Sequence, residues 1–220
     1  MSTTDNAALR NRRGALRLLG FHGMGAAAAS VAAFAASTAA SAQQRPPSSL
    51  RELALRRRSV RRYSDQPISR ETLQAMLETA LLAPTSWGRE VVEFVVVEGR
   101  ERLFELAQCK SIGAPSIAQA AAAVVVIADM SSAEFWIEDA SVAATYLLLA
   151  AEEQGLGACW NHIRNRSGRR DAAQEEIKAL LGIPARYAVL CMVSLGHKGE
   201  KKSPRSEADI PKANIHYGVF

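Results

Sequence analysis

The sequence has few cysteines and histidines, and their spacing predicts neither a metal site nor a disulfide framework. Cys109, Cys159 and Cys191 lie far apart, form no C-x-x-C pair and are odd in number. The four histidines are scattered as well. The motifs H-E-x-x-H, G-x-G-x-x-G and G-x-S-x-G are absent, and so is a P-loop lysine. These absences argue against zinc proteins, disulfide-stabilised scaffolds and several large enzyme classes.

The positive charge of the chain is concentrated in a few places. The formal net charge is +5. Residues 1–42 contain four arginines and one aspartate, a formal charge of +3, which leaves +2 for the remaining residues. A nearly neutral body lacks the broad basic face of a general nucleic-acid-binding protein, so we expect no nucleic-acid partner. A local basic cluster favours a small anion instead.

The first 42 residues have the layout of a secretory signal peptide. A charged start, N-R-R-G-A-L-R, precedes an alanine-rich apolar stretch, and the sequence A-S-A provides a cleavage site after Ala42. The pair Arg12-Arg13 resembles a twin-arginine signal. We therefore expect an exported, periplasmic protein with residues 43–49 as a flexible linker. An uncleaved anchor helix is the alternative, but alanine contributes little transfer free energy, so we expect no stable membrane anchor.

The rest of the sequence predicts an α+β domain with about four strands and five or six helices. Serines are placed to cap a short helix that runs into residue 56 and another that begins after Ser69 and stops before Pro84. The buried face of the second helix is predicted to contain Leu73, Met76, Leu77, Ala80 and Leu81. Further helices are predicted as two short pieces over 100–120, and over 134–154 and 171–181. Strands are predicted over 93–98, 122–128, 156–163 and 187–196.

Two features predict a homodimer. The helix over 134–154 is apolar on nearly all sides, so it should be buried either in a core or in an interface between subunits. Residues 201–220 have no core periodicity, and we expect this tail to wrap the domain or a dimer partner.

Residues 56–63, R-R-R-S-V-R-R-Y, contain five arginines in eight positions. In an extended segment Arg57, Ser59 and Arg61 alternate, so their side chains can converge on one side. Guanidinium groups with a hydroxyl are well suited to a phosphate. A solvated surface is the alternative interpretation of the same cluster.

Two other stretches can present flat or backbone groups to a ligand. The sequence A-P-T-S-W joins a predicted helix to a strand and carries Trp87. In G-L-G-A-C-W, two glycines permit close backbone approach beside Trp160. For the first stretch the alternative is an ordinary helix–strand connection with a packed tryptophan, and His162 is expected to be a partnered structural histidine rather than a catalytic base.

The order of these motifs resembles the FMN-dependent nitroreductase family over about residues 50–200. The series runs R-R-S-V-R-x-Y, A-P-T-S-W-G, E-F-V-V-V-E, W-I-E-D-A-S-x-A-A-T, G-L-G-A-C-W, L-G-I-P and V-S-L-G. The resemblance implies a sandwich with a central, mostly antiparallel sheet flanked by helices. It also implies a domain-entwined homodimer with one FMN at each end of the shared interface.

The resemblance implies a set of cofactor-binding residues. On the phosphate side these are Arg57, Arg58 and Ser59, with Lys201 or Lys202 returning to the phosphate after the last strand. Arg61 would lie near the ribityl chain and the pyrimidine edge. Residues facing the ring from the same subunit would be Pro84, Thr85, Ser86 and Trp87, and those from the partner would be Trp160 and Asn161. Gly88 and Glu90 depart from the family, because they stand where many members have amide side chains that contact the flavin.

The implied activity is a flavin oxidoreductase that moves two electrons from NAD(P)H to a nitroaromatic, quinone or flavin acceptor. No catalytic side chain is required, because the flavin supplies the reactive atom. Twin-arginine passengers often take up a cofactor before export, which favours a cofactor-loaded enzyme. The alternatives are an exported FMN-binding protein without nicotinamide turnover and another two-electron flavin reaction with a different donor.

Overall fold

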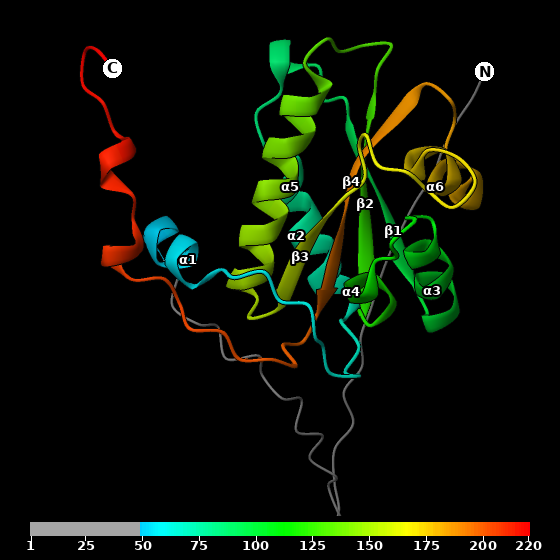
Figure 1. The fold of residues 1–220 in the computed structure, drawn as a ribbon, viewed down its shortest axis with the longest axis horizontal. Coiled ribbons are helices and arrows are strands. Elements are labelled where there is room, and N and C mark those ends of the chain that lie inside the picture. The colour runs from blue at the N-terminus through cyan, green and yellow to red at the C-terminus, as the bar shows by residue number, and fades with distance from the viewer. Residues whose placement is uncertain (1–48) are drawn as a thin grey trace, which may run out of the picture. The chain divides into compact units, whose positions relative to one another are not determined.

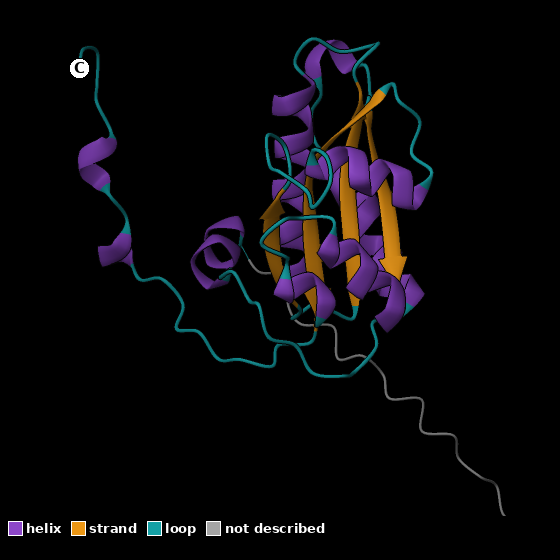
Figure 2. Cartoon of the chain, turned by 45° about the vertical axis from the view of Figure 1, so that its right-hand side comes forward, coloured by secondary structure: helices purple, strands orange, loops and turns teal. Residues whose placement is uncertain are grey.

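The computed structural model describes residues 49–220, which fold around a four-stranded antiparallel sheet (Figures 1 and 2). The strands are β1 (Val92–Glu98), β2 (Ala122–Asp129), β3 (Gly157–His162) and β4 (Tyr187–Gly196). Their order in the sheet is β1-β2-β4-β3, and every neighbouring pair is antiparallel. The predicted α+β class and the mostly antiparallel sheet are confirmed. The predicted signal peptide over 1–42 and all but Ser49 of the predicted linker lie outside the described residues.

Helices cover both faces of the sheet, so the central strands are buried on both sides. Along β2, Val124 and Val126 pack in one core with α2 (Arg70–Leu81) and α5 (Trp136–Glu153). Val125 and Ile127 pack in a second core. The helices of that second core are α3 (Arg100–Gln108), α4 (Pro115–Ala118) and α6 (Ala173–Leu181). The alternation explains the continuous apolar run of β2, because both sets of side chains face a core.

The helix ends follow the capping residues seen in the sequence. Ser49 and Glu52 form a capping box at the start of α1 (Leu50–Arg56), and Ser69 Oγ accepts a hydrogen bond from Thr72 N at the start of α2. One predicted face position is wrong, because Leu81 is 56% exposed. Eight residues beyond Leu73 a helix has rotated by about 80° from its starting direction, which turns Leu81 away from the core.

Only one side of α5 is fully buried within this chain. Ala140, Ala144 and Leu147 are buried against the sheet, whereas Val142 and Leu149 on the opposite side are half-buried and Tyr146 is exposed. The half-buried side is the apolar surface from which we predicted a dimer interface.

The C-terminal tail lies beside α1. Arg205 N donates to Leu55 O over 2.8 Å, and Arg51 forms an ion pair with Glu207. Figure 1 shows the red tail next to α1, and Tyr217 and Phe220 at its end are almost fully exposed. Within residues 49–220, no helix is long and apolar enough to cross a membrane.

Candidate functional site

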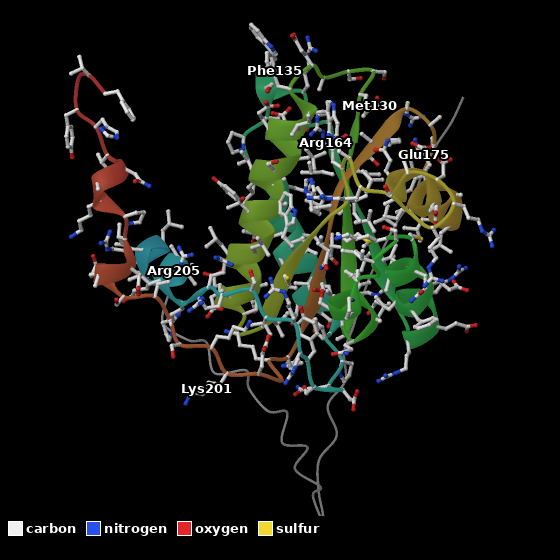
Figure 3. All side chains as sticks on the ribbon, viewed as in Figure 1. Met130, Phe135, Arg164, Glu175, Lys201 and Arg205 are labelled. Atoms are coloured by element: carbon white, nitrogen blue, oxygen red, sulfur yellow. The ribbon has the colours of Figure 1, made fainter. Side chains whose placement is uncertain are left out.

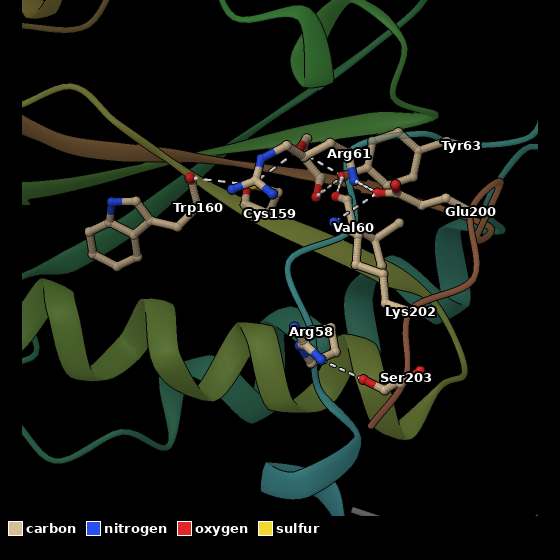
Figure 4. A network of polar contacts seen from close by, with 10 residues as sticks. Arg58, Val60, Arg61, Tyr63, Cys159, Trp160, Glu200, Lys202 and Ser203 are labelled. Atoms are coloured by element: carbon tan, nitrogen blue, oxygen red, sulfur yellow. Dashed lines mark hydrogen bonds and ion pairs between the residues drawn. The ribbon is translucent and has the colours of Figure 1, made fainter. Parts of the chain in front are cut away.

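The arginine segment over residues 57–63 runs across the ends of β3 and β4. Val60 N donates to Ala158 O of β3 over 3.0 Å. Gly199 N, just beyond β4, donates to Arg62 O over 2.9 Å, and Ser64 N donates to His197 O over 3.0 Å. These backbone hydrogen bonds hold the segment extended, as the alternation of its side chains predicts (Figure 4).

Glycines make this close approach possible. A Cβ atom on Gly157 would lie 2.7 Å from Cγ1 of the buried Val60. A Cβ on Gly196 or on Gly199 would lie 2.7 Å from an atom of Tyr63. The Tyr63 hydroxyl donates to Val60 O over 2.6 Å, and burial raises the pKa of this hydroxyl. Gly157, Gly196 and Gly199 are therefore explained by the Val60 and Tyr63 atoms that pack against them.

Three predicted cofactor ligands act electrostatically on the buried thiol of Cys159. Burial raises the pKa of Cys159, and the positive charges of Arg61, Lys202 and Arg57 act in the opposite direction. Neither Arg57 nor Arg61 forms an ion pair with a carboxylate of residues 49–220. Arg57 and Arg61 therefore carry guanidinium charges that no carboxylate in the described part of the chain neutralises, which fits a phosphate, whereas Lys202 pairs with Glu200.

Glu200 is the acidic neighbour of this cation group. Its Oε1 accepts a hydrogen bond from Arg61 N over 2.6 Å and lies 3.4 Å from Lys202 Nζ. The hydrogen bond from the Arg61 backbone is the largest cause of a lowered pKa at Glu200. A surface cavity of about 420 Å³ adjoins the group; its lining residues are Lys198, Gly199, Glu200, Lys201 and Lys202.

Arg58 and Lys201 lie differently from the other predicted phosphate ligands. The Arg58 guanidinium donates to the carbonyl of Ser203, so it contacts the tail (Figure 4). Lys201 is exposed, on the stretch that leads to Arg205 (Figure 3). The structure thus brings Arg61 and Lys202 to the same Glu200 carboxylate, places Arg57 within electrostatic range of the same thiol, and directs Arg58 to the tail.

The predicted ring-facing turn is anchored to α5 by a residue that sequence reasoning missed. Ser86 donates two hydrogen bonds of 2.8 Å to Asp139 Oδ1, one from its backbone N and one from its hydroxyl. Asp139 is 4% exposed. The signal in the sequence was an acidic residue on a nearly apolar helix, within W-I-E-D-A-S.

The turn itself has a left-handed backbone. The φ angle is +59° at Trp87, +63° at Gly88 and +49° at Glu90. A left-handed conformation is unfavourable for a bulky residue, and such strain clusters at ligand-binding sites. The Trp87 side chain is 84% exposed, so its ring is accessible to a flat ligand or to another subunit.

Trp160 and Asn161 lie on opposite faces of β3, as consecutive strand residues do. Trp160 packs against the core that contains α5. Asn161 Oδ1 accepts a hydrogen bond of 2.9 Å from Ser116 Oγ of α4, on the other face. His162 stacks with Trp160 at 6.5 Å between ring centroids, and burial lowers the pKa of His162. The expectation that His162 is a partnered histidine agrees with this geometry.

A second missed residue, Glu152 of α5, connects the arginine segment to the body. Its side chain is 7% exposed, and its Oε2 accepts a hydrogen bond from Lys198 Nζ over 2.8 Å. Its Oε1 lies 3.8 Å from Arg56 Nε.

Another cavity, of about 460 Å³, lies between α3 and α6 and is lined by Glu105, Cys109, Arg169 and Glu176 among others. Its acidic and basic side chains are mixed, so its charge favours no anion, and it contains none of the predicted cofactor residues.

Comparisons with known proteins agree on one family. A sequence profile described as "Nitroreductase family" matches residues 54–197. A protein of Archaeoglobus fulgidus, whose name includes NADH dehydrogenase/NAD(P)H nitroreductase, is 37% identical over 165 residues; the match covers 73% of this chain and 88% of the relative.

Solved structures give the same result. An FMN-dependent nitroreductase from Clostridium difficile is 39% identical, with a TM-score of 0.74, and the match covers 76% of this chain and 98% of that one. An NADPH:FMN oxidoreductase from Vibrio harveyi, solved in complex with NAD+, is 27% identical with a TM-score of 0.64. That match covers 77% of this chain and 76% of the other.

Proposed function

Because the chain belongs to the nitroreductase family, we propose that it is an FMN-dependent oxidoreductase that takes electrons from NAD(P)H. The observation that carries the proposal is the group of Arg57, Arg61 and Lys202 around Cys159, since these cations fit the phosphate of FMN. The names of the relatives support both the cofactor and the nicotinamide donor.

The residues present also fit the rest of FMN. The turn over residues 84–87 offers the exposed ring of Trp87, and its position is fixed by the hydrogen bonds from Ser86 to Asp139. Held by these residues, FMN would supply two-electron redox chemistry between NAD(P)H and an acceptor. Arg61 carries a positive charge that would stabilise negative charge on the pyrimidine edge of the ring.

The acceptor we propose is a small nitroaromatic, quinone or flavin. Gly88 and Glu90 replace the amides of many family members, and both lie in the left-handed part of the turn. Gly88 has no side chain and the Glu90 carboxylate has no amide donor, so we expect fewer side-chain hydrogen bonds to the flavin edge and a different range of acceptors.

We also propose that the functional unit is a homodimer and that the chain is exported. The half-buried outer side of α5 and the exposed aromatic end of the tail support the homodimer. Arg12-Arg13 and the apolar stretch that follows support export. Trp160 would then approach the flavin from the partner subunit.

Anaerobic rapid mixing tests the activity. The FMN-loaded protein is mixed with NADH or with NADPH, and the absorbance of oxidised flavin is followed. Rapid bleaching with either nucleotide is the expected result. Flavin that stays oxidised with both would instead support an exported FMN-binding protein, or a reaction with a different donor.

A further inference from the structure

Two acidic side chains are buried in the described part of the chain, and both belong to α5. Asp139 lies in the first turn of the helix and Glu152 in its last turn. A helix rises about 1.5 Å per residue, so the two positions are separated by about 20 Å along its axis. A buried carboxylate is costly unless it has partners, so the partners of each residue indicate what it holds in place.

Glu152 holds the arginine segment at both ends. Arg56, whose Nε lies 3.8 Å from Glu152 Oε1, directly precedes Arg57. Lys198, which donates to Glu152 Oε2 over 2.8 Å, pairs through its backbone with Tyr63. Glu152 therefore fixes the stretch that carries Arg57 and Arg61 without reaching the cation group itself.

Asp139 holds the other predicted flavin segment. Its Oδ1 accepts both hydrogen bonds from Ser86. Its Oδ2 is buried and has no hydrogen-bond partner within residues 49–220. The contacts with Ser86 are therefore the hydrogen bonds that this buried carboxylate makes in the described chain, and they tie the left-handed turn to α5.

We propose that Glu152 and Asp139 are two independent positioning residues, one for the phosphate end and one for the ring end of FMN. The proposal rests on the proposed function, because it assigns roles to residues around an FMN site. The helix acts as the spacer between the two anchors. Each carboxylate acts through the segment that it holds, and neither contacts the flavin.

The proposal predicts a selective loss of FMN affinity for one substitution and an equal loss of FMN and riboflavin affinity for the other. Glu152→Gln removes the charge that pairs with Arg56 and Lys198, so the phosphate ligands should lose their fixed position. FMN affinity should fall roughly tenfold, while affinity for riboflavin, which lacks the phosphate, should change by less than about twofold. Asp139→Leu, which is close in size and removes the acceptor of both Ser86 hydrogen bonds, should weaken FMN and riboflavin equally, because both carry the ring, and it should shift the absorption spectrum of the bound flavin.

The experiment is a fluorescence titration of each purified full-length protein with FMN and with riboflavin. Glu153→Gln is the matched control, because Glu153 is the exposed neighbour of Glu152 on the same helix. It should bind both ligands like the wild type. Circular dichroism checks the fold of every variant. If Glu152→Gln does not fold, Lys198→Met should reproduce the selective loss of FMN affinity, and Lys198→Arg should retain wild-type affinity because it keeps the charge.

The outcomes separate this inference from the proposed function. A wild-type protein that binds no FMN would overturn both. If the wild type binds FMN but Glu152→Gln, or Lys198→Met in its place, weakens FMN and riboflavin to the same extent, the positioning role of Glu152 is refuted. If Asp139→Leu weakens FMN more than riboflavin, the assignment of Asp139 to the ring end of FMN is refuted.

Discussion

Arg57 offers the sharpest test of the cation group. It is half-buried, contributes positive charge at Cys159 and forms no ion pair with a carboxylate of residues 49–220. Its backbone N donates to Leu53 O, a contact that an alanine substitution keeps. Arg57→Ala should therefore remove a phosphate ligand and leave the fold intact.

The expected loss of FMN affinity follows from the charged hydrogen bond that Arg57 would make to the phosphate. A hydrogen bond to a charged group contributes about 1.5–3 kcal/mol, which corresponds to a loss of FMN affinity of roughly ten- to hundredfold. Riboflavin should bind the wild type more weakly than FMN does, and it should bind Arg57→Ala with nearly the same affinity as the wild type. Arg62→Ala is the matched control, because Arg62 is exposed and one position out of the alternation.

Flavin fluorescence titration of the proteins with both ligands provides the affinities. Equal losses of FMN and riboflavin affinity in Arg57→Ala would show that this arginine does not bind the phosphate. The cluster would then be a solvated surface.

Three further predictions test the packing, the assembly and the export of the chain. Gly157→Ala would place a Cβ atom 2.7 Å from Val60 Cγ1, so the free energy of unfolding, measured by thermal denaturation, should fall by about 1–3 kcal/mol. An unchanged Tm would contradict the packing of the arginine segment on β3. Light scattering of the FMN-loaded protein should give the mass of two chains, whereas the mass of one chain would argue against the homodimer. Replacing Arg12 and Arg13 together by lysine should leave full-length, FMN-loaded protein in the cytoplasm, and normal export of this variant would exclude a role for the pair.

Much of the fold could be predicted because its signals are local. The run at 122–128 is apolar throughout, and β2 is buried on both faces. Ser49 and Ser69 each cap the helix that follows them. Leu81 was predicted wrongly because the rotation of the helix between Leu73 and Leu81 turns the Leu81 side chain away from the core.

The site could be predicted only in part. The alternation of Arg57 and Arg61 indicated a shared side, and Val60, out of step with them, is buried against Gly157. Asp139 and Glu152 were missed because their partners are distant in sequence: 53 residues separate Ser86 from Asp139, and 46 separate Glu152 from Lys198. No local pattern encodes such a contact.

A crystal structure of the protein with FMN tests the central claim most directly. The account predicts that the phosphate lies within hydrogen-bond distance of Arg57 and beside Arg61 and Lys202, with the flavin ring against the turn at Trp87. A phosphate bound elsewhere, for example in the cavity between α3 and α6 beside Arg169, would contradict it.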